Sequence, residues 1–316
     1  MIYAYPLKQV PSHCHAGRGC VILITRVVKD LPPVRSGNIR LGNPHYMRSV
    51  PSRYRAKTLV VLGAVVYAAA LFADPIETHG VTFKNEVYRD VPFTVAWIDR
   101  EKAELELFWK DERGVPFVNF SRLDSWLQDR GKTLVVATNS GIYAEDRTPL
   151  GLHIAGGEEL RALNPHKGGK GNFALKPNGV FYIDAAGAHI GTTEAYMEAM
   201  PKAQLAVQSG PMLVIDGVLH PKFNEESTSI HFRNGIGVLD EKHIALVISN
   251  LPVNFYTFAS YFKDHLHCSN ALYLDGSLSG IYAPAIDRTA PGLEYVGMLA
   301  VTTDRAPLSE GLVSDE

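Results

Sequence analysis

The chain has 316 residues, with 31 Lys and Arg against 33 Asp and Glu and a formal net charge of −2. The charge is unevenly distributed, because residues 1–73 hold 10 of the basic but only 1 of the acidic residues. The remainder therefore carries 21 basic and 32 acidic residues, a net charge of −11. This acidic body lacks the basic stripe that nucleic acid requires, so the composition argues against a nucleic-acid partner.

The N-terminal region predicts an export signal rather than a membrane span. Residues 58–73 carry no charge and follow a basic stretch. A helix of that length spans about 24 Å, short of the roughly 30 Å of a bilayer core. A basic stretch, an apolar stretch and a small-residue ending are typical of a signal peptide. We therefore expect an extension at 1–46, a signal peptide at 47–73 and one domain at 74–316, in a periplasmic or secreted protein. The alternative is an uncleaved N-terminal anchor, and only this alternative brings membrane contact.

The domain must be stabilised by its core. Cys268 is its one cysteine and cannot form an internal disulfide, so we expect it to be a buried apolar residue. Neither His153 nor His231, the histidines nearest the expected strands, shows metal-ligand spacing. The sequence therefore leaves the metal ligands unknown. It makes no cofactor certain, and it leaves open the binding of a divalent cation.

Short strand-like runs dominate from Val91 onward. They predict strand pairs at 93–98 with 103–109 and at 134–138 with 205–208, because these runs are rich in Val and Leu. Hairpins are expected across three turns, Asn178-Gly179, Asp216-Gly217 and Asp240–His243.

Three helices are predicted among these strands. The first is capped by Ser121 and stops at Gly131, the second covers 193–200, and the third covers 255–266 with aromatic residues on one face. The pattern is typical of an α+β fold, a mixed and mostly antiparallel sheet scaffold with a few packed helices in a single domain.

Polar turns beside apolar strands mark the candidate site. They occur at Gln208–Pro211, Arg233–Gly237 and Leu274–Gly280. Strands that end in Gly, Ser, Asp or Arg place polar groups where the scaffold stops and a ligand can approach the backbone.

These turns, with two others, resemble the phosphodiester glycosidase family, which includes the lysosomal uncovering enzyme and many bacterial exported proteins. The resemblance covers about residues 91–303 and lies in five motifs in order. They are Asn139-Ser140-Gly141-Ile142-Tyr143, Gly171-Asn172-Phe173 with Pro177-Asn178-Gly179-Val180-Phe181, Gln208-Ser209-Gly210-Pro211, Arg233-Asn234-Gly235-Ile236-Gly237 and Leu274-Asp275-Gly276-Ser277. The chain is similar to the bacterial branch. It departs from the family in its last turn, Asp275-Gly276-Ser277-Leu278-Ser279, which has fewer glycines and hence less backbone freedom.

The resemblance implies hydrolysis of a sugar 1-phosphodiester at the anomeric C1–O bond, giving free sugar and a phosphomonoester. Carried over by motif, the catalytic candidates are Asp275, Arg233 and Asn139. The substrate-binding candidates are Ser209, Gly210, Asn234, Gly276 and Ser277. The implied partner is a small molecule containing a sugar phosphate, or an envelope glycan.

The residue types agree with this chemistry independently. Phosphate leaves as a stable anion, since its last proton has a pKa of about 6, so one carboxylate and a phosphate clamp suffice. Arg233 suits the clamp because its fork meets two phosphate oxygens, and a surface arginine or a structural salt bridge is the alternative. Asp275, at the end of an apolar strand, suits a base, a nucleophile or a metal ligand, and an Asx turn with Gly276 is the structural alternative.

Two other functions are compatible with the same residues. One is a non-catalytic envelope protein that binds a glycan or an anionic polymer in the same pocket. The other is a phosphodiesterase that attacks phosphorus and releases a sugar phosphate.

Overall fold

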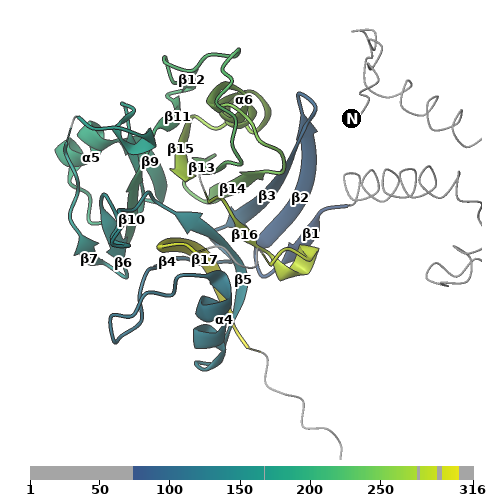
Figure 1. Ribbon diagram of the computed structural model, residues 1–316. Helices are drawn as coiled ribbons and strands as arrows, with labels where there is room; N and C mark the ends of the chain where they lie inside the picture. The colour runs from purple at the N-terminus through teal and green to yellow at the C-terminus, as the bar shows by residue number, and fades with distance from the viewer. Residues whose placement is uncertain (1–73, 167, 276–277, 290–293, 306–316) are drawn as a thin grey trace, which may run out of the picture. The chain divides into compact units, whose positions relative to one another are not determined.

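The computed structural model describes residues 74–166, 168–275, 278–289 and 294–305. The expected extension and signal peptide lie outside these residues, as do Gly276 and Ser277. Within them, all the strand pairs are antiparallel and the helices are few (Figure 1). The predicted α+β fold class is confirmed.

The largest sheet has eight strands in the order β1-β2-β3-β14-β13-β15-β11-β12. Their bounds are β1 (Ile76–Thr78), β2 (Val81–Tyr88), β3 (Val91–Asp99), β11 (Met212–Ile215), β12 (Val218–Leu219), β13 (Asn234–Val238), β14 (His243–Ser249) and β15 (Asn270–Asp275). The central strands are buried over most of their length, which explains why β14 and β15 read as nearly continuous apolar runs.

Two smaller sheets complete the scaffold. One has the order β7-β6-β10-β8-β9, with β6 (His153–Ala155), β7 (Glu158–Arg161), β8 (Gly179–Ile183), β9 (Ala188–Thr192) and β10 (Leu205–Ser209). The other has the order β16-β5-β17-β4, with β4 (Leu105–Phe108), β5 (Lys132–Ser140), β16 (Ile281–Tyr282) and β17 (Gly297–Asp304).

The helices cover the outer faces of these sheets. They are α4 (Phe120–Gln128), α5 (Thr193–Ala199), α6 (Phe255–Ser260), a π-helical turn η2 (Tyr261–His265) and the 3-10 turns η1 (Asn172–Ala174) and η3 (Pro284–Ile286). Asn119, rather than the expected Ser121, caps α4, because its side chain accepts a hydrogen bond from Arg122 N at 2.8 Å. Among the described residues, no helix has the length and apolar character needed to cross a bilayer.

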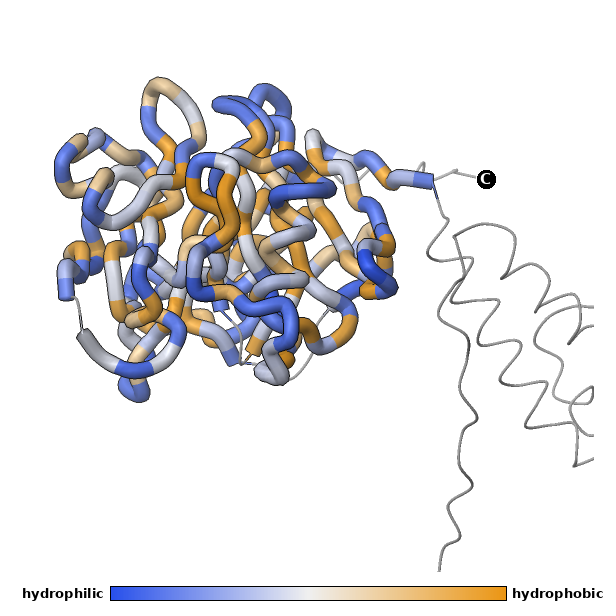
Figure 2. The backbone as a smooth tube through the Cα atoms, turned by 90° about the horizontal axis from the view of Figure 1, so that it is seen from above, coloured by the Kyte–Doolittle hydropathy of each residue, from blue (hydrophilic) through white to orange (hydrophobic). Residues whose placement is uncertain are grey.

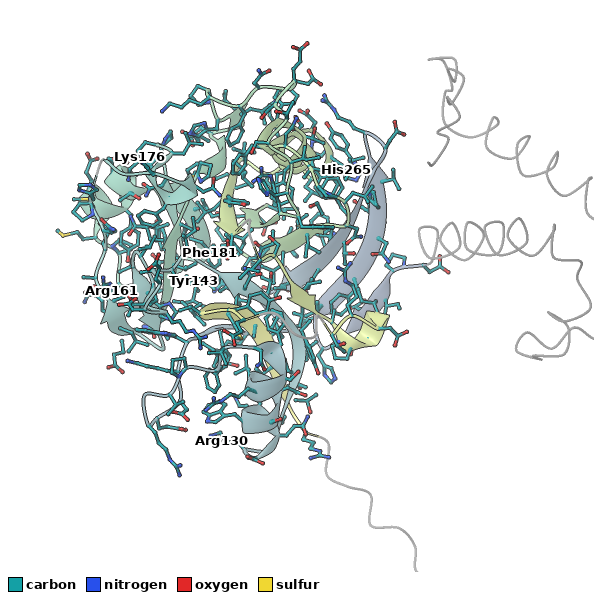
Figure 3. The ribbon with its side chains drawn as sticks, viewed as in Figure 1. Arg130, Tyr143, Arg161, Lys176, Phe181 and His265 are labelled. Atoms are coloured by element: carbon teal, nitrogen blue, oxygen red, sulfur yellow. The ribbon has the colours of Figure 1, made fainter. Side chains whose placement is uncertain are left out.

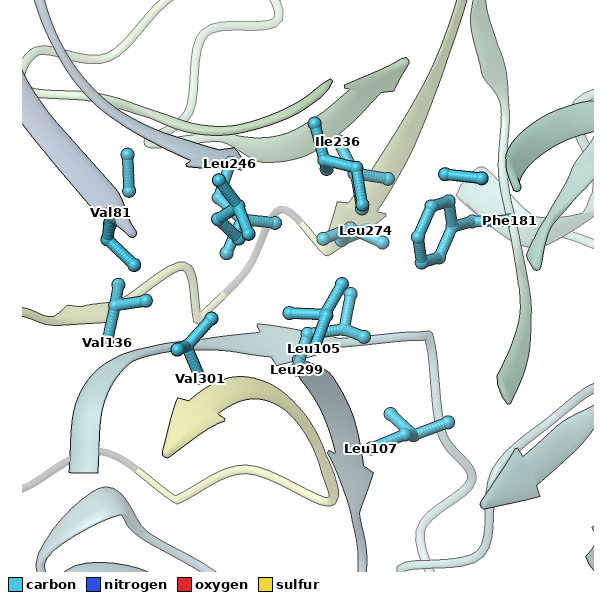
Figure 4. Close-up of a cluster of buried hydrophobic side chains, with 14 of the residues drawn as sticks. Val81, Leu105, Leu107, Val136, Phe181, Ile236, Leu246, Leu274, Leu299 and Val301 are labelled. Atoms are coloured by element: carbon cyan, nitrogen blue, oxygen red, sulfur yellow. The ribbon is translucent and has the colours of Figure 1, made fainter. Parts of the chain in front are cut away.

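The main core lies where the three sheets meet. Val81 and Leu246 come from the eight-stranded sheet, Leu105 and Val136 from the four-stranded sheet, and Phe181 from the five-stranded sheet (Figure 4). Two further clusters pack α6 and η2 against the eight-stranded sheet and α4 against the four-stranded sheet. Hydrophobic residues accordingly concentrate in the interior strands and hydrophilic ones in the outer loops (Figure 2).

Local pairings were predicted better than distant ones. The hairpins at Asp216-Gly217 and Asp240–His243 are confirmed. The expected pairs 93–98 with 103–109 and 134–138 with 205–208 are wrong, because β3 pairs with β2 and β14, whereas β5 pairs with β16 and β17. The hairpin across Asn178-Gly179 is also wrong: η1 replaces its first strand, and β8 pairs with β9 and β10.

Candidate active site

Three strand ends from two sheets meet at one point. Asn139 lies near the end of β5, Asn234 begins β13, and Asp275 ends β15. Asn234 and Asp275 face each other across the β13–β15 ladder, where the register shifts between Asn234 and Gly235. Sequence analysis identified all three residues, and the structure brings them together.

Asn234 lies at the centre of this cluster and is completely buried. Its Oδ1 accepts a hydrogen bond from Asp275 N at 3.0 Å. Its Nδ2 lies 2.7 Å from Asn139 O, 3.0 Å from Asn139 Oδ1 and 2.8 Å from Thr138 Oγ1. A single amide therefore joins β5 to β15 and fixes the backbone from which the Asp275 carboxylate projects.

The Asp275 carboxylate receives a side-chain hydrogen bond from the same cluster. Asn139 Nδ2 donates to Asp275 Oδ2 at 3.3 Å, and Asp275 retains 9% of its exposure. Two tyrosines lie within the electrostatic reach of this carboxylate. Burial first, and then the negative charge of Asp275, raise the pKa values of Tyr143 and Tyr295. Tyr143 belongs to the segment after β5 (Figure 3).

Ser279 and Gly280 add further hydrogen bonds to the cluster. Gly280 N donates to Asn139 Oδ1 at 2.9 Å, and Thr138 Oγ1 donates to Gly280 O at 2.8 Å. Ser279 Oγ lies 2.7 Å from Asp275 O. Sequence analysis missed the roles of Thr138, Ser279 and Gly280, although each stands beside or within a motif that it singled out. The two expected binding residues Gly276 and Ser277 lie outside the described residues.

The Gln208–Pro211 turn contacts the strand that carries Asp275. Ser209 is completely buried and its Oγ donates to Leu274 O at 2.9 Å, immediately before Asp275. This contact uses the Ser209 hydroxyl, a predicted substrate-binding group, to support the strand that carries Asp275. Gly210 permits close packing, because a Cβ there would lie 2.5 Å from Asn178 Cβ.

The expected phosphate clamp at Arg233 needs correction. Its side chain is 1% exposed and donates from Nε to Val253 O at 2.8 Å, from Nη1 to Tyr273 Oη at 3.1 Å and from Nη2 to Ser229 O at 3.1 Å. The guanidinium carbon also lies 3.7 Å from the centre of the Phe255 ring. Reaching a phosphate would disrupt this whole arrangement, so the geometry assigns Arg233 a structural role.

Lys176 brings a positive charge to the Gly210 side of the site. Its Nζ lies 2.7 Å from Asn178 Oδ1, and Asn178 packs against Gly210. Lys176 is labelled in Figure 3. Sequence analysis missed this lysine, although it immediately precedes the Pro177-Asn178-Gly179 motif.

Of the other residues considered for chemistry, Cys268 and His153 are buried, whereas His231 is exposed. Cys268 is buried, as predicted, and burial raises the pKa of its thiol to about 12. Burial, with a smaller effect of Lys110, lowers the pKa of His153 to about 4. Within the described ranges, no group of three or more His, Cys, Asp or Glu side chains is arranged to hold a metal ion.

The cluster thus presents one carboxylate, rigidly oriented and partly accessible, at the meeting point of two sheets. Such a carboxylate can accept a proton from water or attack an electrophilic carbon, whereas the neighbouring amides are fully used in holding it. The arrangement is compatible with a hydrolase that uses a single carboxylate.

Comparison with known proteins specifies this class. A sequence profile described as phosphodiester glycosidase matches residues 132–289, which include Asn139, Asn234 and Asp275. The uncharacterized protein YigE of Escherichia coli (strain K12) is 33% identical over 229 residues, covering 72% of this chain and 84% of that protein. The chain belongs to the phosphodiester glycosidase family, a family of hydrolases that act on glycosyl bonds.

Among solved structures, the chain is similar to the catalytic domain of zebrafish N-acetylglucosamine-1-phosphodiester alpha-N-acetylglucosaminidase, described as auto-inhibited by its pro-peptide. The sequence identity is 14% and the TM-score is 0.48, over 70% of this chain and 81% of the zebrafish chain.

Proposed function

We propose that this glycosidase hydrolyses a sugar 1-phosphodiester at the anomeric C1–O bond, with Asp275 as the essential carboxylate. The observation that carries the proposal is the Asn139–Asn234–Asp275 cluster, which holds one carboxylate in a fixed position near the surface. In the reaction, a water oxygen becomes the C1 hydroxyl of the sugar. The C1–O bond electrons leave with the phosphate oxygen.

One carboxylate is enough because of the leaving group. A glycoside of an ordinary alcohol needs a second carboxylic acid to protonate the departing oxygen. A phosphomonoester departs as a stable anion, since its second pKa is about 6. Asp275 then acts as a base toward water or as a nucleophile at C1. Retention or inversion at C1, followed by NMR during turnover, separates these two roles.

The phosphate also needs a positively charged partner. With the Arg233 guanidinium engaged in the core, the proposal assigns this role to Lys176, which Asn178 and Gly210 connect to the support of the site. An ammonium group binds phosphate as a point charge. Lys176→Met is expected to raise KM more than it lowers kcat, whereas Lys176→Arg restores part of the affinity.

The bond that breaks can be tested directly. Purified protein is incubated in oxygen-18 water with a panel of α- and β-linked sugar 1-phosphodiesters, and the products are analysed by mass spectrometry. The proposal expects the label in the free sugar. Label in phosphate together with a sugar phosphate product identifies attack at phosphorus instead. Retained binding without turnover by the wild-type protein identifies a binding protein.

A matched pair of variants tests the role of Asp275. Asp275→Asn preserves the size of the side chain and an acceptor for Asn139, and it is expected to lower kcat about 10²- to 10⁴-fold with the fold intact. Asp216→Asn makes the same change in the exposed turn between β11 and β12, and it is expected to leave kcat unchanged. Equal turnover by the two variants would exclude Asp275 from the reaction.

The proposal places the enzyme in the periplasm or outside the cell, acting on envelope or extracellular material. The basic and apolar pattern of residues 47–73 supports export. N-terminal sequencing of the protein from fractionated cells is expected to begin at Asp74. A cytoplasmic protein with residues 47–73 intact would contradict this location.

A further inference from the structure

Three large apolar side chains are exposed on two neighbouring segments. Ile230 is 54% exposed, Phe232 50% and Leu251 46%. Single exposed hydrophobic residues are common on protein surfaces, whereas several together often mark a binding surface. We call these three residues the apolar rim.

The apolar rim is directly connected to the catalytic cluster. Ser279 Oγ lies 3.2 Å from Phe232 O and 2.7 Å from Asp275 O, so one hydroxyl lies between the two backbones and can donate to either carbonyl. The same Oγ lies 3.3 Å from Asn234 Oδ1. The backbone of Phe232 therefore lies close to the backbone of Asp275.

The backbone beneath the rim is firmly held. His231 and Val253 exchange two backbone hydrogen bonds of 3.1 and 2.8 Å. Arg233 O accepts a hydrogen bond from Ser249 N at 2.9 Å, and Arg233 N donates to Ser249 Oγ at 2.9 Å. On one segment, residues 250–252 lie between these two connections, and on the other segment Phe232 alone lies between them. Leu251 therefore lies on the same stretch of surface as Phe232.

The buried Arg233 side chain explains why the rim stays exposed. The guanidinium of Arg233 packs in the interior beside Phe255 and Tyr273, and the side chain of the adjacent Phe232 is exposed to solvent. The rim is thus a fixed apolar surface at the edge of the site, and covering it with an apolar group releases ordered water from both surfaces.

We propose that the apolar rim binds the alcohol group on the far side of the phosphate, so that the substrate is a sugar 1-phosphodiester of an apolar, alkyl-type alcohol. This inference rests on the proposed function. Aliphatic Ile230 and Leu251 offer no hydrogen-bonding side chains to a second sugar, whereas an alkyl chain gains free energy by burial against all three residues. Asp275 holds the sugar end and the rim selects the other end.

A series of substrates tests this selection. Sugar 1-phosphodiesters with one sugar and methyl, butyl or octyl alcohols are compared below the concentrations at which they aggregate. The ratio of kcat/KM for the octyl and methyl esters is expected to be about tenfold or more, because each buried methylene favours binding. Phe232→Ser is expected to lower this ratio severalfold. Val218→Ser changes an equally apolar residue, 65% exposed on the edge strand β12, and should preserve the ratio.

The outcomes separate this inference from the proposed function. Equal kcat/KM for methyl and octyl esters overturns the inference while the proposed function stands. If no ester is hydrolysed, the proposed function fails, and titration calorimetry with octyl and methyl phosphate still tests the rim. Tighter binding of octyl phosphate that depends on Phe232 supports it, and equal binding overturns it. Binding of the protein to lipid vesicles through Phe232, without any chain-length effect on turnover, assigns the rim to a membrane and also overturns the inference.

Discussion

Asn234 Oδ1 accepts a hydrogen bond from Asp275 N at 3.0 Å, so a side chain of one strand fixes the backbone that carries the Asp275 carboxylate on the next. The opposite end of the same amide binds Asn139 and Thr138 on another sheet. The orientation of Asp275 therefore depends on the packing of two sheets and not on its own turn alone.

The first prediction concerns the donor side of this amide. Asn234→Asp keeps the shape but replaces the Nδ2 donor with an acceptor facing Asn139 O and Asn139 Oδ1. We expect loss of about 2–4 kcal/mol in the free energy of unfolding and a large fall in kcat, because an unpaired charge is buried among acceptors. Urea unfolding and turnover are measured together. Asn224→Asp, on an exposed loop where the side-chain oxygen only accepts from Glu226 N, is the matched control and should behave like wild type.

The second prediction separates a structural Arg233 from a phosphate clamp. Arg233→Lys loses the planar fork that meets three acceptors and packs on Phe255, and it is expected to cost about 3 kcal/mol or more of stability. Arg130→Lys is the control, because Arg130 also lies over an aromatic ring, 3.9 Å from the centre of Trp126, but at the surface. Its cost should stay within about 1 kcal/mol. If Arg233→Lys raised KM and left stability unchanged, Arg233 would be a phosphate-binding residue and not a structural one.

The case of Arg233 shows where sequence reasoning reached its limit. Its motif correctly predicted a strand beside the site, and alternation along a strand places neighbouring side chains on opposite faces. The sequence does not reveal which of Arg233 and Asn234 faces the cluster, because that depends on the register shift between β13 and β15. In the structure, Asn234 is the residue whose side chain hydrogen-bonds to Asp275.

The same limit applies to the fold. The turns at Asp216-Gly217 and Asp240–His243 were predictable because their own residues favour tight hairpins. The pairing of β3 with β14 joins segments about 150 residues apart, and short Val-rich runs do not identify partners at that separation. Asn139, Asn234 and Asp275 could be chosen from motifs, but the roles of Thr138, Ser279 and Gly280 emerge only from the contacts in the folded protein.

The third prediction is a pH dependence of stability that comes from His153. Burial lowers the pKa of this histidine to about 4 in the folded protein, against an ordinary value of about 6.5. Between these values the unfolded chain binds a proton that the folded protein does not, so stability falls as the pH falls through this window. The loss contributed by His153 approaches about 3 kcal/mol near pH 4.

Urea unfolding at pH 7, 6, 5 and 4 measures this contribution. His153→Leu is expected to reduce the slope of stability against pH in that window, whatever its effect on stability at pH 7. His166→Leu, at an exposed position, should retain the wild-type slope. An unchanged slope in His153→Leu means that His153 is protonated in the folded protein, contrary to its burial.

The last prediction compares two buried tyrosines. Tyr295 is 1% exposed, and among the described residues its hydroxyl has no hydrogen-bond partner. The hydroxyl lies against Gly280, where a Cβ would overlap Tyr295 Oη. Tyr261 is equally buried, but its hydroxyl donates to Glu86 Oε2 at 2.7 Å. Removing an unpaired hydroxyl should release its desolvation cost, whereas removing the paired one should take from Glu86 one donor of a set that also includes Lys84 and His265.

Tyr295→Phe is therefore expected to leave the free energy of unfolding unchanged or to raise it by up to about 1 kcal/mol. Tyr261→Phe is expected to lower it by about 1.5–3 kcal/mol, because its hydrogen bond is made to a charged group. Both variants delete the same atom from the same residue type, so their difference isolates the hydrogen bond. Equal destabilisation by the two variants would mean that Tyr295 Oη holds a buried water, which would place an ordered solvent molecule beside Gly280 and the Asn139–Asn234–Asp275 cluster.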